Sequence, residues 1–369
     1  MLLFCDSFDH YTSLGAKYNT YGISGASIVG AGNQYTGTQC LQINGGAGPY
    51  INVASKTHVL VGTRFNSCGV GGIPILYLEG AVGSSDINCI LQLGTDGGVY
   101  VYKTWTSGAY NSTYATSAPG VANLGAYNYY EVKFFGDPTA GSIQVRVNGV
   151  LVINVANANT VAGSSTAAIG GIGLRGRGSS FNSYHDDVYV LDWSTAPLTD
   201  FIGPVQVFCC LPTSDSSPLQ WTPSVAGPHY PLVAAVPPNT VQWVNSATPG
   251  QVDQYLHTFA GIPGNAVIFA VQHGMNVALD AAGTASLASC VGGVAATVAA
   301  LSSTSYGYVL TPYAANPVNG AGWVYSALAA TGFGPKITAT SGPNVRVTQS
   351  VVELLGGALC PTFQAMVLG

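Results

Sequence analysis

The chain has 369 residues, a net charge of -5 and only 10 Lys plus Arg residues. So few basic residues cannot form the positive surface with which proteins neutralise nucleic-acid phosphates, so DNA and RNA are excluded as expected partners. Charged residues make up 7% of the chain, whereas hydrophobic residues make up 47%. This composition predicts a folded protein with a sizeable core, and the length suits two domains.

Short segments rich in β-branched and aromatic residues follow one another through the first half of the chain. Each is bounded by Gly, Ser or Asp, a pattern that predicts strands joined by turns. The predicted strands span residues 2–8, 40–44, 56–65, 73–79, 88–94, 98–105, 167–174 and 184–192. Strands at this spacing are typical of an antiparallel sandwich or barrel.

Residues 129–156, YYEVKFFGDPTAGSIQVRVNGVLVINVA, predict a three-stranded antiparallel meander. Apolar side chains alternate with polar or charged ones, as in half-buried strands, so Glu131 and Lys133 are expected on the solvent side. Asn148-Gly149 tolerates the positive φ angles of a two-residue type I′ turn and predicts the second hairpin.

Several segments of the chain carry a family resemblance. The opening FCDSFDHY, the segments YYEVKFF and SIQVRVNGVLV, and the strand YHDDVYVLD resemble the concanavalin A-like or laminin-G-like jelly-roll sandwiches of tailed-bacteriophage virion proteins. The resemblance continues through TDFIGPVQV, LQWTPS and TPGQVDQY, and so covers most of the chain. It implies a lectin-like domain in a structural protein of the virion, in the tail, baseplate or head decoration, with other virion proteins and further copies of itself as partners.

The resemblance and the strand pattern place a domain boundary near residues 200–204, which gives domains 1–203 and 204–369. Residues 212–240 are rich in Pro and Ser and predict an ordered loop without regular structure, packed on the second domain through Trp221, Tyr230 and Trp243. Residues 320–331 are predicted to form one short helix that ends before Gly332. Further strands are predicted at 266–279, 284–291, 295–301, 306–310, 335–340 and 344–355. The predicted fold class is therefore all-β, with a jelly-roll sandwich followed by a second, mainly antiparallel β domain.

No charged residue lies between Asp280 and Lys336. A solvent-exposed surface of this length normally carries several charges, so one interpretation is contact with another copy or a neighbouring protein. The alternative is a surface coated with Ser, Thr and Asn. The first interpretation makes the second domain an assembly domain.

Catalytic chemistry finds little support in the sequence. Sandwich folds host glucanases that use a pair of carboxylates, but Glu79, Glu131 and Glu353 lie in separate predicted strands. No GxSxG motif is present. His185-Asp186-Asp187 is the densest ionisable cluster, and a metal or acid/base role is one interpretation of it. Without a bulge its two carboxylates point to opposite faces, so these residues are expected instead to bond neighbouring loops or residues 6–9 of the first strand. The sequence thus predicts a protein that is not an enzyme, with no catalytic residue, no metal and no cofactor.

The eight cysteines form no CxxC motif, and most lie in apolar surroundings. Buried thiols are therefore expected, with disulfides as the alternative. The apolar start of the chain is too short for a secretory signal. Residues 285–301 are interrupted by Gly292-Gly293 and predict paired strands rather than a membrane span.

One aromatic stretch, residues 100–114, stands out as a candidate binding site. Tyr102, Trp105, Tyr110 and Tyr114 alternate with small polar residues. Such a mixture can stack on sugar rings of a host surface polysaccharide, anchor a protein interface, or pack within the sandwich. A close basic pair, Arg175 and Arg177, can meet an acidic sugar or a phosphate, but a solvated loop is expected there.

Overall fold

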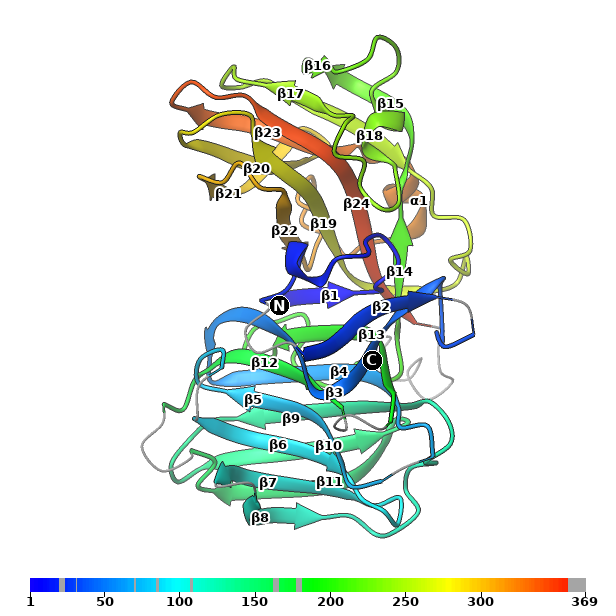
Figure 1. The fold of residues 1–369 in the computed structure, drawn as a ribbon, viewed down its shortest axis with the longest axis vertical. Coiled ribbons are helices and arrows are strands. Elements are labelled where there is room, and N and C mark those ends of the chain that lie inside the picture. The colour runs from blue at the N-terminus through cyan, green and yellow to red at the C-terminus, as the bar shows by residue number, and fades with distance from the viewer. Residues whose placement is uncertain are drawn as a thin grey trace. The chain divides into compact units, whose positions relative to one another are not determined.

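The structure is a computed structural model that describes residues 1–19, 24–30, 32–69, 71–83, 86–106, 109–161, 166–176 and 181–357, without the side chains of residues 24, 104–106 and 109–111. The chain divides into two compact units, Met1–Pro204 (unit 1) and Val205–Gly369 (unit 2). Strands dominate both units (Figure 1) and their pairs are antiparallel, which confirms the predicted all-β class.

Unit 1 contains a short 3-10 helix, Leu14–Ala16, and the first strands of the chain. These strands are β1 (Leu2–Asp6), β2 (Ser24–Gly30), β3 (Gln39–Lys56), β4 (His58–Asn66), β5 (Ile73–Glu79), β6 (Ile87–Leu93), β7 (Val99–Thr106), β8 (Ala109–Thr116), β9 (Asn128–Phe135), β10 (Gly141–Val147), β11 (Val150–Ala158), β12 (Ile169–Arg175) and β13 (Ser183–Asp192).

These strands form one 13-stranded sheet with the order β11-β10-β9-β4-β13-β3-β12-β5-β6-β7-β8, to which β1 and β2 add beside β13 and β3. Figure 1 shows the cyan strands β5 to β8 side by side. Strands β8 and β11 end the order but contact each other, because the sheet curls round a core between its two halves. Leu76, Leu91 and Val101 are among the fully buried residues that fill this core.

The predicted meander is confirmed as β9, β10 and β11, and Asn148 and Gly149 have φ angles of 50° and 83° in the turn between the last two. The expected solvent exposure of Glu131 is wrong, because this side chain is fully buried. The Glu131 Oε1 atom accepts hydrogen bonds from the Tyr189 hydroxyl at 2.7 Å and the Gly203 amide at 3.0 Å. The segment that follows β13 therefore covers the face of β9 that was expected to be exposed to solvent.

Unit 2 is built from two sheets, of six and five strands. The strand order is β16-β17-β24-β19-β22 in the first, where β14 also pairs with β24, and β15-β18-β23-β20-β21 in the second. The strands are β14 (Gln206–Cys210), β15 (Pro212–Leu219), β16 (Thr222–Pro223), β17 (Val244–Ser246), β18 (Asp253–His257), β19 (Val267–Leu279), β20 (Ala285–Val291), β21 (Val294–Leu301), β22 (Gly307–Tyr313), β23 (Phe333–Thr340) and β24 (Val345–Gly357).

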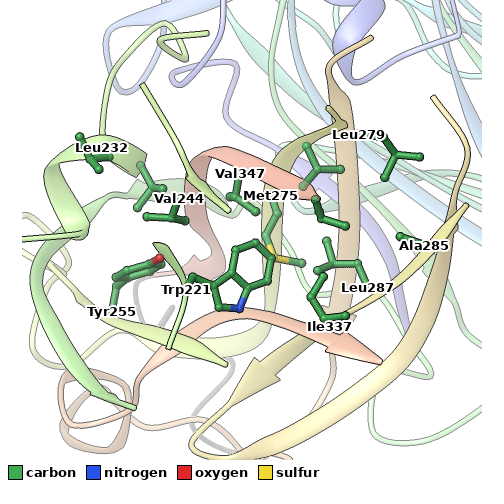
Figure 2. Packing of buried hydrophobic residues seen from close by; sticks show 13 residues of the cluster. Trp221, Leu232, Val244, Tyr255, Met275, Leu279, Ala285, Leu287, Ile337 and Val347 are labelled. Carbon is green, nitrogen blue, oxygen red and sulfur yellow. The ribbon is translucent and has the colours of Figure 1, made fainter. Parts of the chain in front are cut away.

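Apolar side chains from both sheets meet in the core of unit 2. Figure 2 shows Trp221 at the centre of one cluster, which includes Tyr255, Met275, Leu287 and Ile337. Burial of such side chains supplies the main favourable free energy of a sandwich, because their apolar surface leaves water.

The region predicted to lack regular structure, residues 212–240, does pack through Trp221, but it also contains β15, β16 and the 3-10 helix Tyr230–Val233. The prediction was wrong for β15 because this strand pairs with β18 despite Pro212 and Pro218. The helix predicted for residues 320–331 is present as α1 but is shorter, because it spans only Tyr325–Ala329. Residues 285–301 form the paired strands β20 and β21, as predicted.

Among the described cysteines, Cys5, Cys40, Cys89, Cys210 and Cys290 are buried and Cys68 is exposed; Cys360 lies outside the described residues. Burial raises the pKa of the Cys89 and Cys210 thiols to about 12, so both stay protonated at neutral pH. No helix in the described ranges has both the length and the apolar character needed to cross a membrane.

Candidate functional site

The aromatic stretch of residues 100–114 forms the hairpin of β7 and β8, at one end of the strand order of unit 1. The backbone register places Tyr102 opposite Thr113 and Trp105 opposite Tyr110. The side chains of Trp105 and Tyr110 lie outside the described part of the chain.

Tyr102 and Tyr114 do not share a surface. A register shift follows Val101, and the Tyr114 ring lies on the core side, with the Lys103 ammonium 4.8 Å from its centroid. Its hydroxyl oxygen is buried without a hydrogen-bond partner in the described structure. Burial raises the pKa of Tyr114, and the nearby Cys89 thiol, itself in the core, adds to this effect. The two described side chains of the predicted group, Tyr102 and Tyr114, thus lie on different faces.

Tyr102 belongs instead to a row of side chains that crosses the outer face of the sheet. The register aligns Tyr50 of β3, Gly173 of β12, Tyr77 of β5, Ile90 of β6 and Tyr102 of β7. Because side chains of a strand alternate between faces, this row lies opposite the buried core residues of the same strands. We call Tyr77, Tyr100 and Tyr102, all half-buried, with the residues beside them, the tyrosine face.

Two glycines of β12 explain how one end of this face is built. A Cβ atom on Gly173 would lie 2.9 Å from a carbon of the Tyr50 ring and 3.1 Å from Arg175 Nε. A Cβ atom on Gly171 would lie 2.9 Å from a Val82 methyl group. The Tyr50 ring and the Arg175 side chain can therefore lie flat on the sheet only because residue 173 has no side chain.

Arg175 is buried on this face and not in a solvated loop, so that expectation was wrong; Arg177 lies outside the described residues. The Arg175 guanidinium carbon lies 4.7 Å from the Tyr50 ring centroid and 4.3 Å from that of Tyr77. Its Nη2 atom is 3.2 Å from Glu79 Oε1 and also donates to the Tyr50 hydroxyl. The cation that lies against Tyr50 and Tyr77 is therefore paired within the protein.

Glu79 completes this buried group. Its Oε1 atom accepts from the Tyr50 hydroxyl at 3.2 Å, and its Oε2 atom accepts from the Gly83 amide at 2.9 Å. Burial raises the pKa of the Glu79 carboxyl group, and the opposing charge of Arg175 only partly offsets this effect. Because Arg175 and Glu79 neutralise each other, this end of the face presents aromatic and hydroxyl groups with little net charge.

The other end of the face is formed by Tyr100 and Tyr102. Their ring centroids are 6.2 Å apart and their planes differ by 7°. The Tyr100 hydroxyl donates to Asp96 Oδ2 at 3.3 Å, and the Asp96 charge raises the pKa of this phenol. Beside Tyr100 in the register lies Gln92, whose Oε1 atom is buried without a hydrogen-bond partner in the described structure. A ligand or water that donates to this oxygen would satisfy it.

The His185-Asp186-Asp187 cluster bonds a neighbouring loop, as predicted. Asp186 Oδ2 accepts from the Tyr35 and Thr36 amides at 2.9 and 3.0 Å, whereas Asp187 accepts from the Thr36 hydroxyl and from Arg64 Nε at 2.8 Å. The carboxylates do converge on one loop, because β13 has a register shift here and Asp187 has a φ angle of 49°. Burial and the Asp187 charge raise the pKa of Asp186 well above its usual range.

The three glutamates stay apart, in β5, β9 and β24. Glu353 is fully buried and its Oε2 atom accepts from Gln272 Nε2 at 2.7 Å. In unit 2, His273 is also fully buried between the hydroxyl groups of Ser289 and Ser350, at 2.6 and 2.9 Å. These side chains are hydrogen-bonded inside their units, so they offer structural rather than surface chemistry.

No family model matches the chain, and no curated protein matches it. Solved structures with some similarity include the alginate lyase Aly36B, which is 14% identical, with 51% of this chain and 95% of that chain covered and a TM-score of 0.31. Domain 4 of AbnA, an arabinanase of Geobacillus stearothermophilus in complex with arabinotriose, is 15% identical, with 48% and 80% covered and a TM-score of 0.32. A carbohydrate esterase of the Shiga toxin-encoding bacteriophage phi24B is 12% identical, with 51% and 98% covered and a TM-score of 0.30. Similarities of this size assign neither a family nor a function to the chain.

Proposed function

We propose that the tyrosine face of unit 1 binds carbohydrate, and that the protein is a non-enzymatic receptor-recognition component of a phage particle that attaches to host surface polysaccharide. One observation carries this proposal. Half-buried tyrosines from β5 and β7 lie on one face, where the neighbouring Arg175 guanidinium is already neutralised by Glu79.

Carbohydrate suits this row for physical reasons. Tyrosine rings offer apolar surface to the carbon-bound hydrogens of a sugar, while hydroxyl and amide groups at the ring edges bond its hydroxyl groups. The half-buried tyrosines lie on β5 and β7 with the buried Ile90 of β6 between them, so at about 4.8 Å per strand spacing Tyr77 and Tyr102 are roughly 10 Å apart. A surface of this length favours an oligosaccharide over a single sugar.

The proposal is tested by binding of labelled protein to intact host cells and to cells stripped of surface polysaccharide. Binding should disappear on stripping, and Tyr77→Ala and Tyr102→Ala should each weaken it at least about tenfold, as truncation of a central aromatic contact does. Tyr35→Ala is the matched control, because Tyr35 is 51% exposed elsewhere on unit 1. Equal loss in the control, or no binding by the wild-type protein, would exclude the tyrosine face.

A second candidate function is a purely architectural part of the virion, in the tail, baseplate or head decoration. The observation that favours it is β21, an uncharged strand at the end of its sheet in which Val294 and Val298 are 39% and 47% exposed. Exposed apolar strands at a sheet edge are the usual place for association with further copies or neighbours.

The two candidates differ in their dependence on polysaccharide. An architectural part should form oligomers at high concentration and be labelled by antibodies on intact particles, whether or not it binds stripped cells. Val298→Lys should reduce such association, whereas Val241→Lys, at a position that is 74% exposed in unit 2, should leave it unchanged. A protein that stays monomeric and is absent from particles would exclude this function.

A further inference from the structure

Arg346, in β24 of unit 2, occupies an unusual position for a cation. Its guanidinium carbon lies 4.3 Å from the ring centroid of Trp243. Its Nε atom is buried without a hydrogen-bond partner in the described structure, where Arg346 forms no ion pair. Unit 2 contains only one other Lys or Arg, Lys336, so this charge is conspicuous in its surroundings.

The strand register defines the neighbours of Arg346. Asn245 of β17 and Ala278 of β19 lie directly opposite it on the two adjacent strands. Val345 and Val347, on either side of Arg346, are fully buried in the core cluster of Figure 2. By alternation the Arg346 side chain therefore lies on the outer face of this sheet, where it is half-buried, with Asn245 and Trp243 beside it.

A second buried donor lies next to the guanidinium. The Tyr306 hydroxyl is buried, and its proton has no acceptor in the described structure. Burial raises the pKa of Tyr306, whereas the Arg346 charge and a hydrogen bond from the Arg346 side chain to the phenol oxygen lower it, so the phenol lies against the guanidinium. The Nε–H group of Arg346 and the O–H group of Tyr306 are thus two neighbouring buried donors without an acceptor, which is rare in folded proteins.

The nearest acidic residue in the strand register cannot supply that acceptor. Asp280 follows β19 two residues after Ala278, but both of its oxygens are engaged by Asn344, whose amide nitrogen and side-chain Nδ2 lie at 2.9 and 2.7 Å. By contrast, Arg64 and Arg175 of unit 1 also lie over aromatic rings, but each has a carboxylate partner. Arg346 has the same aromatic support without the counter-ion.

We propose that Arg346, Tyr306, Asn245 and Trp243 form a binding site for a carboxylate group. A carboxylate accepts from the guanidinium fork and from the Tyr306 hydroxyl, and the Asn245 amide adds a further donor. The indole holds the guanidinium in place, so little side-chain entropy is lost on binding. The carboxylate belongs either to an acidic sugar or to the end of a peptide chain, because both present the same two oxygens.

The full chain, with 15N at the arginine Nε positions, provides a direct test. The NMR resonances of Arg64, Arg146, Arg175, Arg177 and Arg346 are followed during titration with sodium galacturonate or N-acetylglycine at constant ionic strength. The Arg346 resonance should move and saturate with one or both probes, and the probe that acts identifies the source of the carboxylate. Methyl galacturonate and N-acetylglycinamide, which lack the charge, should leave it in place.

Three results would overturn the site. These are no shift with either carboxylate, an equal shift with the uncharged analogues, or an equal shift of Arg64 and Arg175, which are already paired. Tyr306→Phe should raise the dissociation constant several-fold, because one charge-assisted hydrogen bond is lost while the ring remains. An unchanged dissociation constant in this variant would also contradict the proposal.

Discussion

Arg175 of unit 1 and Arg346 of unit 2 are built alike but serve different purposes. Each lies on the outer face of a sheet and rests against an aromatic ring. Each also has a small residue beside it, which is Gly173 of the same strand for Arg175 and Ala278 of the neighbouring strand for Arg346. Of the two, only Arg175 has a carboxylate partner, Glu79, among the residues that the structure describes. The comparison teaches that the aromatic ring fixes the position of a guanidinium, whereas the counter-ion decides whether its charge is available to a ligand.

The difference separates the two faces chemically. The tyrosine face can bind groups that stack and share hydrogen bonds, because its cation is paired. The face around Arg346 suits an anion, because the Arg346 Nε–H group and the Tyr306 O–H group both lack an acceptor in the described structure.

The largest expected effect is the loss of stability in Arg175→Ala, compared with that in Arg346→Ala. Arg175→Ala leaves the buried Glu79 carboxylate without its counter-ion and should cost about 3 kcal/mol in unit 1. Arg346→Ala leaves no carboxylate unpaired and should cost less than about 1 kcal/mol in unit 2. Hydrogen exchange of peptides from both units in increasing urea measures the two free energies. Equal costs would contradict the distinction between the two arginines.

A smaller loss of stability in unit 1 is expected from Gly173→Ala. The new methyl group would lie 2.9 Å from the buried Tyr50 ring and close to Arg175, so the pair must shift on the sheet. Overpacking of this kind costs about 1–3 kcal/mol. Gly125→Ala is the matched control, because the nearest atom to its Cβ would be 3.7 Å away. Urea unfolding of both variants by hydrogen exchange in unit 1 checks the prediction, and equal stability would show that Gly173 is not needed for the close approach.

Much of the fold could be predicted from the sequence, because strand alternation and turn residues are local signals. The meander and the Asn148-Gly149 turn were found in this way. Exposure was less predictable: Glu131 sits at a solvent-side position of its strand, but a segment far away in sequence covers it. Burial on the face of a strand that points away from the core depends on such long-range packing. It therefore produces no alternation of apolar and polar residues that the sequence could reveal.

The candidate sites show the same limit of local patterns. Tyr102 was selected from a run of aromatic residues, but its neighbours on the tyrosine face, Tyr50, Tyr77 and Arg175, come from β3, β5 and β12. Their alignment depends on strand order and register, which a single sequence does not specify. The glycines of β12 were the available signal, since glycine in a strand indicates close approach of another group. The contact between Arg346 and Trp243 was missed for the same reason, because the two residues are about 100 positions apart.

The pH dependence of the free energy of unfolding of unit 1 should report on the protonation of Glu79. The folded protein holds the Glu79 proton more tightly than the unfolded chain, because burial raises the pKa of this carboxyl group. The resulting stabilisation is complete below the unfolded pKa of about 4.3 and is lost as the pH rises through the raised folded pKa. Glu79→Gln stays uncharged, so its free energy of unfolding should rise relative to that of the wild type between acidic and neutral pH. A difference that is constant with pH, measured by urea unfolding at several pH values, would show that Arg175 fully offsets the burial.

The smallest expected effect concerns the aromatic support of Arg346. If the indole of Trp243 fixes the guanidinium 4.3 Å from its ring, the two side chains should be coupled by about 0.5–1 kcal/mol. A double-mutant cycle with Trp243→Leu and Arg346→Met measures this coupling, because methionine keeps much of the apolar stem without the charge. The matched cycle uses Tyr77→Leu and Arg175→Met, where the ion pair with Glu79 holds the guanidinium independently of the ring. In the second cycle, the coupling energy between Tyr77 and Arg175 should therefore be a smaller fraction of the stability lost in Arg175→Met. Zero coupling in the first cycle would mean that Arg346 is positioned by its strand alone.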